Sequence, residues 1–527
     1  MDAIYDYLVV GAGSAGCAVA ARLCVDPRVR VALIEAGGQD DDPAIKIPAA
    51  FPTLFGGEHD WDFRTTPQRG LAGRVIRCPR GRGLGGSSSI NANVWTRGHQ
   101  ADFDGWAGVG GPGWSFAGVE PLFRRIEHRA GAHIPSLYGV DGPLYVENVR
   151  GESEATASFL AACAELGLPF SEDVNAPDNT GAGRVSTSQR RGERWSSADG
   201  YLRSISHSNL DVLTHLHVQR ITISDRRATG VEALSRSGRS VALVARREVI
   251  VSAGAINSPH LLMLSGIGPE GPLARHGIEC VSPLPGVGTG LQDHLFVPLI
   301  VHCPRPVTLA SAGGSDAAEA YKLHRRGPLT SNIAEAACFL ASGAEQPAPD
   351  LEIAFLPVAF VNDGLESQSE HALTIAAVLL QPNSTGRVRL RSAAAADPPE
   401  IDPGYLTDPG GDDIRRLRHG LEIARSLFGT AALAPYTGDQ WFEDLDLGDP
   451  DSVDQHIRHH SGSAFHLVGT CRMGSDSGAV VDTELRVHGV SGLRVADASV
   501  MPRITRGHTH APSVVIGERA ADLIRGT

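Results

Sequence analysis

Short hydrophobic runs alternate with glycine-rich junctions in the first part of the chain. Residues 6–10 and 29–34 are apolar runs with the length of buried parallel strands. Between them, residues 17–23 are small and apolar, which is typical of a helix that packs against a sheet. The pattern predicts a strand, a helix and a second parallel strand in that order.

The same kinds of run recur further along the chain. An amphipathic pattern predicts a helix at 156–170, ending near Gly167 and Pro169, and a final helix opens at 508–512. Further strands are expected at residues 211–213, 230–234, 248–251 and 493–496. A glycine junction and a helix follow the strand at 248–251. Glycine junctions after parallel strands indicate a ligand site at the carboxyl ends of the strands.

The region 301–459 has a different pattern. Residues 351–355 and 386–390 alternate between apolar and polar positions, as half-buried strands of an antiparallel sheet do. A chain of 527 residues is too long for one core. The predicted fold class is therefore α/β plus α+β, a Rossmann-like domain with an inserted domain on an antiparallel sheet. The first domain is expected to contain 1–155, 196–300 and 460–527, and the second 156–195 and 301–459.

Composition narrows the class of partner. The net charge is −13 with both signs interspersed, which argues against nucleic acid or an anionic membrane as partner. No apolar stretch is long enough to insert as a membrane span. The chain begins one residue before a folded run and its eight cysteines are scattered, so we expect a cytoplasmic protein with reduced thiols.

The first glycine junction carries the clearest chemistry. Gly11, Gly13 and Gly16 form a G-x-G-x-x-G, and Glu35 ends the second strand. The glycines allow a tight turn, close approach of a pyrophosphate and close helix packing, while the acid can accept hydrogen bonds from a ribose. This arrangement predicts dinucleotide binding and leaves the choice between FAD and NAD open.

A second segment, 79–91, is rich in glycine and serine and predicts neither helix nor strand. The aromatic residues that follow it, such as Trp95 and Trp106, favour a packed loop that brings backbone against a ligand over a flexible linker. Its serines lack the G-x-S-x-G pattern of a nucleophile.

Five ordered segments resemble the glucose–methanol–choline (GMC) family of FAD-dependent oxidoreductases, and the likeness spans the whole chain. They are the unit ending at Glu35 and residues 79–91, 254–269, 287–294 and 497–502. The resemblance implies an FAD-binding domain and a substrate-binding domain. It also implies an FAD held by Gly11, Gly13, Ser14, Ala15, Gly16, Glu35, Ala36, Arg82, Gly86, Ser87, Asn91, Ala92, Asn93, Val94, Val218, Ala253, Asp497, Ala498, His508, Thr509 and His510.

In members that bind FAD covalently, a histidine commonly precedes the asparagine of the first signature loop. Ile90 occupies that position, so we expect noncovalent FAD. The implied activity is oxidation of a primary alcohol, aryl or aliphatic, to the aldehyde by proton abstraction and hydride transfer to flavin N5. The electrons would pass to O2 or another acceptor.

Removal of the hydroxyl proton requires a base, and a neutral imidazole serves near neutral pH. The family places a histidine at the position of His466 and a histidine or asparagine at that of His508. We assign His466 as the principal base and His508 as the hydrogen-bond partner of the alkoxide, and expect His510 beside the flavin. The expected substrate pocket contains Trp61, Val94, Phe355 and Phe465.

Alternatives remain. The same family includes hydroxynitrile lyases that retain FAD without net redox chemistry, and a flavin-binding protein without catalysis is a third hypothesis. His456, His459 and His460 have metal-ligand spacing, but without acidic or cysteine partners nearby a solvated helical face is favoured and no metal site is expected. The sequence leaves the oligomeric state and the individual alcohol open.

Overall fold

One large sheet assembles from segments far apart in the chain. The computed structural model describes residues 3–131, 134, 136–204, 208–364 and 370–526. Seven strands form this sheet in the order β12-β2-β1-β15-β14-β13, with β26 paired to β15. They are β1 (Ala3–Val10), β2 (Val31–Ile34), β12 (Leu210–Leu213), β13 (Leu216–Ser224), β14 (Arg227–Ser235), β15 (Ser240–Val251) and β26 (Leu493–Val495).

The central strands of this sheet are parallel. β12, β2, β1, β15 and β26 pair in parallel, while β13 and β14 add an antiparallel edge. All four residues of β2 are buried, as expected of a strand covered on both faces. Helix α1 (Ser14–Leu23) joins β1 to β2 and packs against α11 (His510–Arg525). The predicted strand–helix–strand unit and Rossmann-like fold are confirmed.

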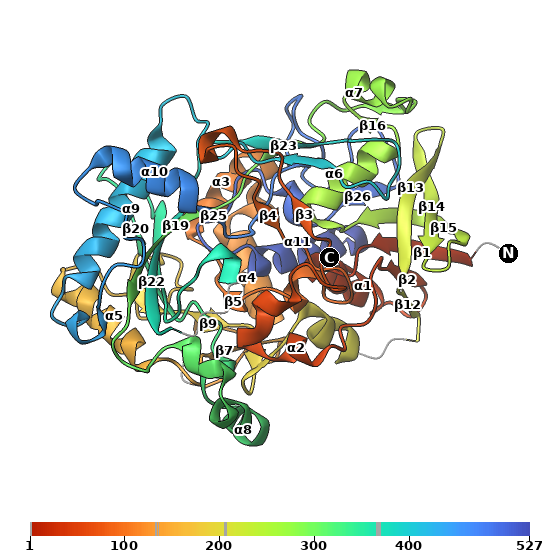
Figure 1. Cartoon of the computed structure of the whole chain (residues 1–527). Coiled ribbons are helices and arrows are strands. Elements are labelled where there is room, and N and C mark those ends of the chain that lie inside the picture. Colours follow the sequence, from red (N-terminus) through yellow and green to blue (C-terminus); the bar gives the residue numbers. More distant parts are fainter. Residues whose placement is uncertain (1–2, 132–133, 135, 205–207, 365–369, 527) are drawn as a thin grey trace.

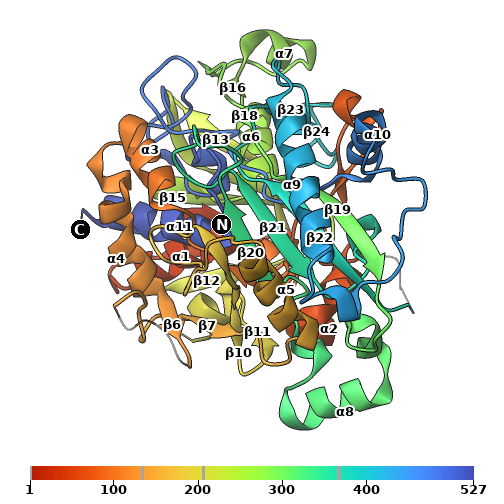
Figure 2. The same cartoon turned by 90° about the vertical axis from the view of Figure 1, so that its left-hand side faces the viewer.

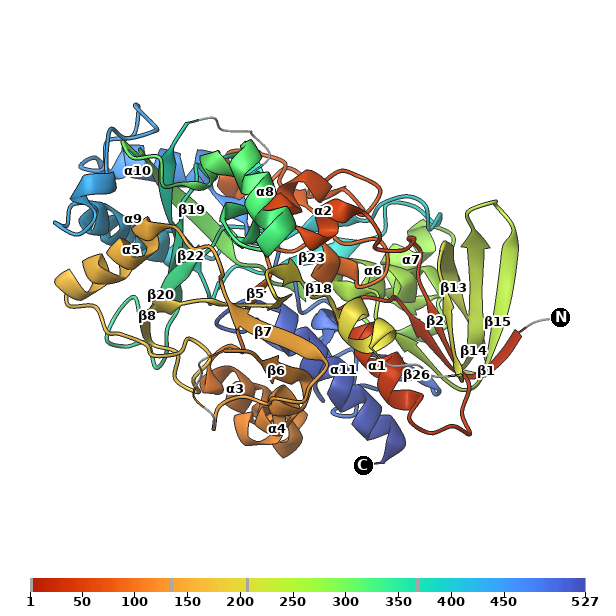
Figure 3. The same cartoon turned by 90° about the horizontal axis from the view of Figure 1, so that it is seen from below.

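A second, six-stranded sheet lies at the other end of the molecule (Figures 1 and 3). Its neighbouring strands are all antiparallel, which confirms the predicted sheet type. In spatial order the strands are β25 (Gly462–Ser463), β19 (Leu295–His302), β22 (Ala372–Leu379), β21 (Leu351–Leu356), β20 (Ala336–Leu340) and β8 (Gly181–Arg184).

Helices cover one face of the second sheet. Figure 2 shows α9 (Asp412–Phe428) lying across its strands, and α5 (Glu154–Glu165) and α10 (Pro450–His460) flank α9. The expectation of half-buried strands at 351–355 was wrong, because every residue of β21 is buried. Helices cover one face of the sheet, and the other face forms a wall of a cavity.

Two further expectations differ from the structure. The run 386–390 forms β23 (Gly386–Arg389), which alternates as predicted but belongs to a separate three-stranded sheet with β18 and β24. The predicted division after residue 300 falls inside β19, which is continuous within the second sheet.

The remaining elements connect the two sheets or extend them. The helices are α2 (Pro43–Lys46), α3 (Gln100–Gly110), α4 (Phe116–Ile126), α6 (Gly254–Leu264), α7 (Glu270–Arg275) and α8 (Ser315–His324). The strands of the minor sheets are β3 (Phe63–Arg64), β4 (Arg77–Cys78), β5 (Val94–Trp95), β6 (Glu127–Arg129), β7 (Leu144–Asn148), β9 (Ser186–Thr187), β10 (Gln189–Arg190), β11 (Glu193–Arg194), β16 (Ile267–Gly268), β17 (Ser282–Pro283), β18 (Thr289–Leu291) and β24 (Glu400–Asp402). Among the described residues, no helix has the length and apolar character needed to span a bilayer.

Candidate active site between the two sheets

The loop between β1 and α1 is packed closely on two sides and open on the third. A Cβ at Gly11, whose φ is +101°, would lie 2.5 Å from the Ser252 carbonyl oxygen, and one at Gly16 would lie 1.9 Å from the Gly11 oxygen. At Gly13 a Cβ would meet nothing within 4 Å. Among the described residues, no side chain caps the N-terminus of α1. The open side therefore presents free backbone N–H groups, which suit a pyrophosphate.

Glu35 joins three loops at the end of β2. Its Oε2 accepts a hydrogen bond from the Ala12 N–H (2.9 Å), and its Oε1 accepts from the N–H groups of Gly37 (2.9 Å) and Gly83 (3.0 Å). Burial raises the pKa of this carboxyl, and the three N–H donors oppose that shift. The carboxylate thus fixes the glycine loop while it lines the cavity.

The segment 79–91 closes over the first glycine loop. The Gly85 N–H donates to the Ala12 carbonyl oxygen (2.8 Å). Gly86 has φ +53°, and a Cβ there would lie 2.7 Å from the Gly13 Cα. The packed-loop interpretation of this segment is therefore the correct one, and both loops form one cradle.

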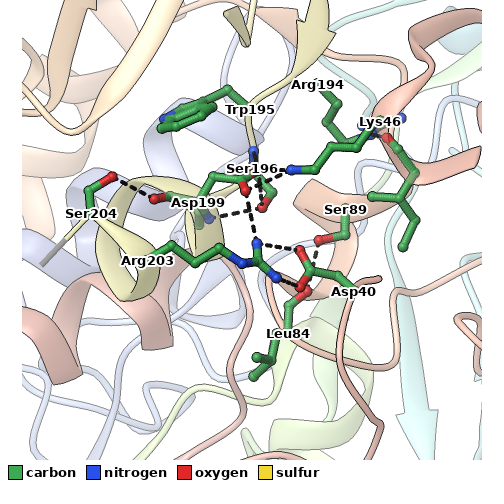
Figure 4. A network of polar contacts seen from close by, with 12 residues as sticks. Asp40, Lys46, Leu84, Ser89, Arg194, Trp195, Ser196, Asp199, Arg203 and Ser204 are labelled. Carbon is green, nitrogen blue, oxygen red and sulfur yellow. Dashed lines mark hydrogen bonds and ion pairs between the residues drawn. The ribbon is translucent and has the colours of Figure 1, made fainter. Parts of the chain in front are cut away.

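A polar network supports the cradle from behind (Figure 4). Asp199 accepts hydrogen bonds from Lys46 Nζ (2.7 Å), Arg203 Nη1 (2.8 Å) and the Ser196 N–H (2.9 Å). Arg203 also pairs with Asp40. Opposite charges hold the pKa of Asp199 below its usual range in spite of burial. The network connects α2, the segment after Glu35 and the residues that follow β11.

Arg194 provides a second support. Its guanidinium is fully buried and donates to the carbonyl oxygens of Ile45 (2.7 Å) and Ser88 (3.2 Å) and to Asn91 Oδ1 (2.7 Å). Burial lowers the pKa of Arg194 to about 9. This cation therefore positions the end of the segment 79–91, where Asn91 enters the cavity.

The cavity extends from the cradle to the second sheet. Most of the residues predicted from the sequence line it. They are Gly11, Gly13, Ser14, Ala15, Glu35, Ala36, Trp61, Gly86, Ser87, Asn91, Ala92, Val94, Val218, Ala253, Phe465, His466, Asp497, Ala498, His508, Thr509 and His510.

Three of the residues assigned to the cofactor lie behind the cavity wall. Gly16 packs beneath the Gly11 carbonyl, and the Arg82 guanidinium lies over the Trp61 ring, 5.0 Å from its centroid. Asn93 is fully buried, with its Nδ2 donating to the Ser188 carbonyl oxygen (3.4 Å). These residues shape the wall and do not line the cavity.

Phe355 was wrongly placed in the substrate pocket. Its ring stacks on Phe159 of α5, with centroids 5.0 Å apart, on the helix-covered face of the second sheet. Because successive strand residues point to opposite faces, Glu352, Ala354 and Leu356 line the cavity instead.

Asp497 closes the cavity floor between β26 and α6. Its Oδ2 accepts from the Gly254 N–H (2.8 Å) and the Ser258 hydroxyl (2.5 Å), and its Oδ1 accepts from the N–H (2.8 Å) and the hydroxyl (2.5 Å) of Ser499. Burial raises the pKa of this carboxyl. The acid therefore holds the ends of two elements together at the cavity.

Two histidines meet beside the second sheet. His294 Nε2 lies 3.0 Å from the Leu380 carbonyl oxygen, and His294 Nδ1 lies 2.9 Å from His466 Nδ1. A carbonyl oxygen only accepts, so Nε2 of His294 carries a proton. Burial lowers the pKa of His294 to about 3, so its ring is neutral and Nδ1 is an acceptor. His466 Nδ1 must then be the donor, which leaves the lone pair of His466 on Nε2.

His466 is suited to act as a base. Its backbone N–H donates to Asp293 Oδ1 (2.7 Å), which fixes the residue beside the cavity. Burial holds the pKa of His466 well below its usual range, and the charges of His508 and Arg80 add to this shift. The imidazole is consequently neutral near pH 7.

The ring of His508 packs against that of His466, with centroids 4.6 Å apart. Its Nε2 is 3.4 Å from Oε1 of Glu352, a buried carboxylate of β21. The backbone N–H of His508 donates to the Thr96 hydroxyl (2.7 Å). The charge of His508 lowers the pKa of both His466 and His294.

Comparison with known proteins decides the family. The family model described as GMC oxidoreductase matches residues 5–296, and its C-terminal counterpart matches 382–517. The chain belongs to the GMC oxidoreductase family.

Curated relatives of this GMC oxidoreductase match over its whole length. The chain is 45% identical over 531 residues to an uncharacterized GMC-type oxidoreductase of Mycobacterium tuberculosis, covering 100% of both chains. It is 38% identical over 529 residues to an alcohol dehydrogenase [acceptor] of Pseudomonas putida, covering 99% of this chain and 96% of the relative.

Solved GMC structures agree in fold. A pyridoxine 4-oxidase from Mesorbium loti superposes with a TM-score of 0.90 at 32% identity, covering 99% of each chain. A formate oxidase of Aspergillus oryzae, studied for the effect of a mutation on FAD modification, superposes with a TM-score of 0.93 at 29% identity, covering 100% of this chain and 98% of the other.

The GMC cradle in this chain fits an FAD. The open space above Gly13 and the uncapped N-terminus of α1 suit a pyrophosphate. At the far end, His510 lines the cavity with a buried Nδ1 that has no hydrogen-bond partner among the described residues. Burial lowers the pKa of His510 to about 4, so a neutral ring faces the space in which a flavin would lie.

Sequence reasoning missed several residues of this GMC site. Asp293 and His294 belong to a segment that carried the resemblance, yet no role had been assigned to them, and Glu352 lay hidden in a strand whose faces could not be distinguished. Of the helical histidines, His459 is exposed as expected, but His456 is buried and its Nε2 donates to the Pro298 carbonyl (2.8 Å). No group of three or more metal-ligating side chains is found among the described residues.

Proposed function

We propose that this chain oxidises a primary alcohol to the aldehyde with a noncovalently bound FAD, passing the electrons to O2 or another acceptor. The observation that carries the proposal is the arrangement of His466 beside His294 and His508 at the cavity wall. The relatives named an alcohol dehydrogenase and a pyridoxine 4-oxidase support an alcohol as substrate.

The chain's own residues handle the proton. His466 Nε2, with its lone pair exposed by the hydrogen bond from Nδ1 to His294, accepts the hydroxyl proton of the alcohol. His508, which lies beside the Glu352 carboxylate, donates a hydrogen bond to the alkoxide oxygen and stabilises its negative charge. When bound, FAD supplies the hydride acceptor. The division of labour between His466 and His508 thus follows from their different neighbours.

The cradle would hold FAD without a covalent bond. The N-terminus of α1 and the loop at Gly13 would bind the pyrophosphate, Glu35 the ribose, and the segment containing Asn91 and His510 the flavin end. Ile90 offers no nucleophile for a covalent link. Denaturation should therefore release FAD into the supernatant, and a yellow precipitate would overturn this part of the proposal.

The test is the visible spectrum of the purified holoenzyme without oxygen, before and after benzyl alcohol is added. Loss of the flavin band supports hydride transfer, and admission of air then separates an oxidase from a dehydrogenase. If neither benzyl alcohol nor aliphatic alcohols bleach the flavin, the hydroxynitrile lyase hypothesis is tested with mandelonitrile. Cleavage of mandelonitrile by an unreduced enzyme would contradict the proposed oxidation.

A further inference from the structure

Asn332 is a buried amide without a partner. Its side chain is fully buried, and neither Nδ2 nor Oδ1 has a hydrogen-bond partner among the described residues. The residue lines the same cavity as His466 and His508. An unpaired buried amide is costly, and native proteins satisfy nearly all such groups. Asn332 therefore indicates a partner that occupies the cavity.

The backbone beside Asn332 is strained. Ile333 has φ +73°, a conformation that β-branched side chains rarely adopt. Its N–H donates to the Ser331 hydroxyl (3.1 Å), and its side chain also lines the cavity. Strain of this kind persists where the surroundings enforce it, and it occurs frequently at ligand sites.

Glu335 enforces this conformation. Its carboxylate accepts hydrogen bonds from the Ser331 hydroxyl (2.6 Å), the Thr156 hydroxyl (2.5 Å) and the Ser153 N–H (2.8 Å). These contacts fix the segment to the first turn of α5 at one end, and β20 begins directly after it at the other. Asn332 is therefore presented by a rigid segment.

The surrounding wall is apolar. Cavity-lining residues of the same hydrophobic cluster as Ile333 include Phe51, Phe296, Ala354, Leu356 and Val378. Among the other polar groups that line the cavity, His508 already contacts both His466 and Glu352. Asn332 consequently supplies a hydrogen-bonding group that the proton chemistry does not use.

We propose that Asn332 selects the substrate: it binds a second polar group of the alcohol, one that both accepts and donates a hydrogen bond. A hydroxyl or a carboxamide satisfies both atoms of the amide, whereas a methyl group leaves them unpaired. The preferred substrates are then diols and hydroxyaryl alcohols rather than simple aryl or aliphatic alcohols. This inference rests on the proposed alcohol oxidation.

Matched alcohol pairs test the proposal. Pentane-1,5-diol is compared with hexan-1-ol, and the 3- and 4-hydroxybenzyl alcohols with the corresponding methylbenzyl alcohols, so that each pair differs by one hydroxyl against one methyl. The rate of flavin reduction divided by the dissociation constant should favour the hydroxyl member of at least one pair by about tenfold or more, because unpaired polar groups reject the apolar analogue. Asn332→Leu and Asn332→Ala should reduce that preference to less than about threefold.

Binding is measured separately from chemistry. In the His466→Ala holoenzyme, perturbation of the flavin band gives the dissociation constant of each alcohol without turnover. The same preference should appear there and disappear in the Asn332→Leu double variant. A preference in binding without flavin reduction would contradict the proposed oxidation and leave the role of Asn332 supported.

Gln189→Met is the matched control. Gln189 Nε2 donates to the Thr330 carbonyl oxygen (3.3 Å), so this variant removes a contact to the same segment without changing a cavity-lining side chain. It should keep the preference for the hydroxyl member. Equal loss in Gln189→Met and Asn332→Leu would overturn the proposal, as would the absence of any preference in the wild type. A shift of the ligand-free flavin spectrum or of FAD affinity confined to the Asn332 variants would also overturn it, because the amide would then serve the cofactor.

Discussion

His294 and His466 face each other through their Nδ1 atoms, which are 2.9 Å apart. Because the Leu380 carbonyl oxygen fixes the proton of His294 on Nε2, this contact also fixes the proton of His466 on Nδ1. His294 is thus a positioning residue that acts on the reaction through His466.

Replacing His294 tests this role. His294→Asn retains an acceptor near the position of Nδ1, whereas His294→Leu removes it. In His294→Leu the rate of flavin reduction should fall by at least about tenfold. A positioned base raises the rate by ~10²–10⁴-fold, and control of its tautomer supplies one part of that increase. In His294→Asn the rate should stay within about threefold of the wild type. Anaerobic stopped-flow spectroscopy measures both.

A second readout separates this role from general packing. Nitrogen NMR of histidine-labelled protein reports which nitrogen of His466 carries the proton, and that proton should lie on Nδ1 in the wild type and in His294→Asn. His456, which is also buried and bonded to a carbonyl, provides control variants. The hypothesis fails if His456→Leu slows reduction as much as His294→Leu does.

The rate of flavin reduction should depend on pH with an unusual acid limb. A base acts only when it is deprotonated, and burial holds the pKa of His466 well below 6.5. The rate should therefore stay constant as the pH falls through 6.5 and decline only at much lower pH. A profile that halves near pH 6.5 would show that the reacting base is solvated. His466→Ala should remove this limb and lower the rate by about 10²–10⁴-fold.

Neighbouring residues of β21 should give opposite phenotypes. Phe355→Ala should lower the free energy of unfolding by about 3–5 kcal/mol, because it leaves a void beside Phe159. Ala354→Phe should fill the substrate end of the cavity and raise the KM of benzyl alcohol about tenfold or more, with little effect on FAD content. Urea unfolding and steady-state kinetics of both variants check this. Similar effects of the two substitutions would contradict the assignment of faces.

The cradle should not tolerate a methyl group at Gly86. Gly86→Ala places a Cβ 2.7 Å from the Gly13 Cα at a φ of +53°, so the two loops must separate and FAD should dissociate more readily. We expect at least about a tenfold rise in the dissociation constant of FAD, equivalent to about 1.4 kcal/mol. Gly105→Ala in α3, where nothing lies within 4 Å, is the control and should retain FAD. Fluorescence of released flavin measures the difference.

Glu352 should matter for the rate rather than for stability. Glu352→Gln replaces the carboxylate beside His508 Nε2 with a neutral amide, so the imidazole that supports the alkoxide loses its anionic neighbour. We expect flavin reduction to slow by about tenfold or more at neutral pH. Unfolding by urea serves as the control measurement, and a matching loss of stability would indicate a structural role instead.

Local signals made the cradle predictable from sequence. The strand, the glycines, the helix and Glu35 lie within one short stretch, and each carries a residue type that its position requires. His466 and His508 were found because their segments resemble a family pattern. The positions of both residues at the cavity agree with that assignment.

The rest of the site depends on contacts between distant segments. Periodicity placed a strand at 351–355, but it could not show that helices cover the side of Phe355 while a cavity lies on the side of Glu352. The contact between His294 and His466 joins residues 172 positions apart. The lack of a hydrogen-bond partner for the Asn332 amide can be recognised only when the positions of the residues around it are known.

The packing of α1 against α11 has a consequence for synthesis of the protein. β1 pairs with β15, and β15 pairs with β26. Residues 508–510 line the same cavity as the first glycine loop. On the ribosome, the nascent cradle must therefore wait for almost the entire polypeptide before it can capture a cofactor. Proteins whose contacts join residues far apart in the sequence fold slowly. Flavin uptake is then a late step that follows synthesis of almost the whole polypeptide, and riboflavin shortage should leave full-length apoprotein as a target of proteolysis.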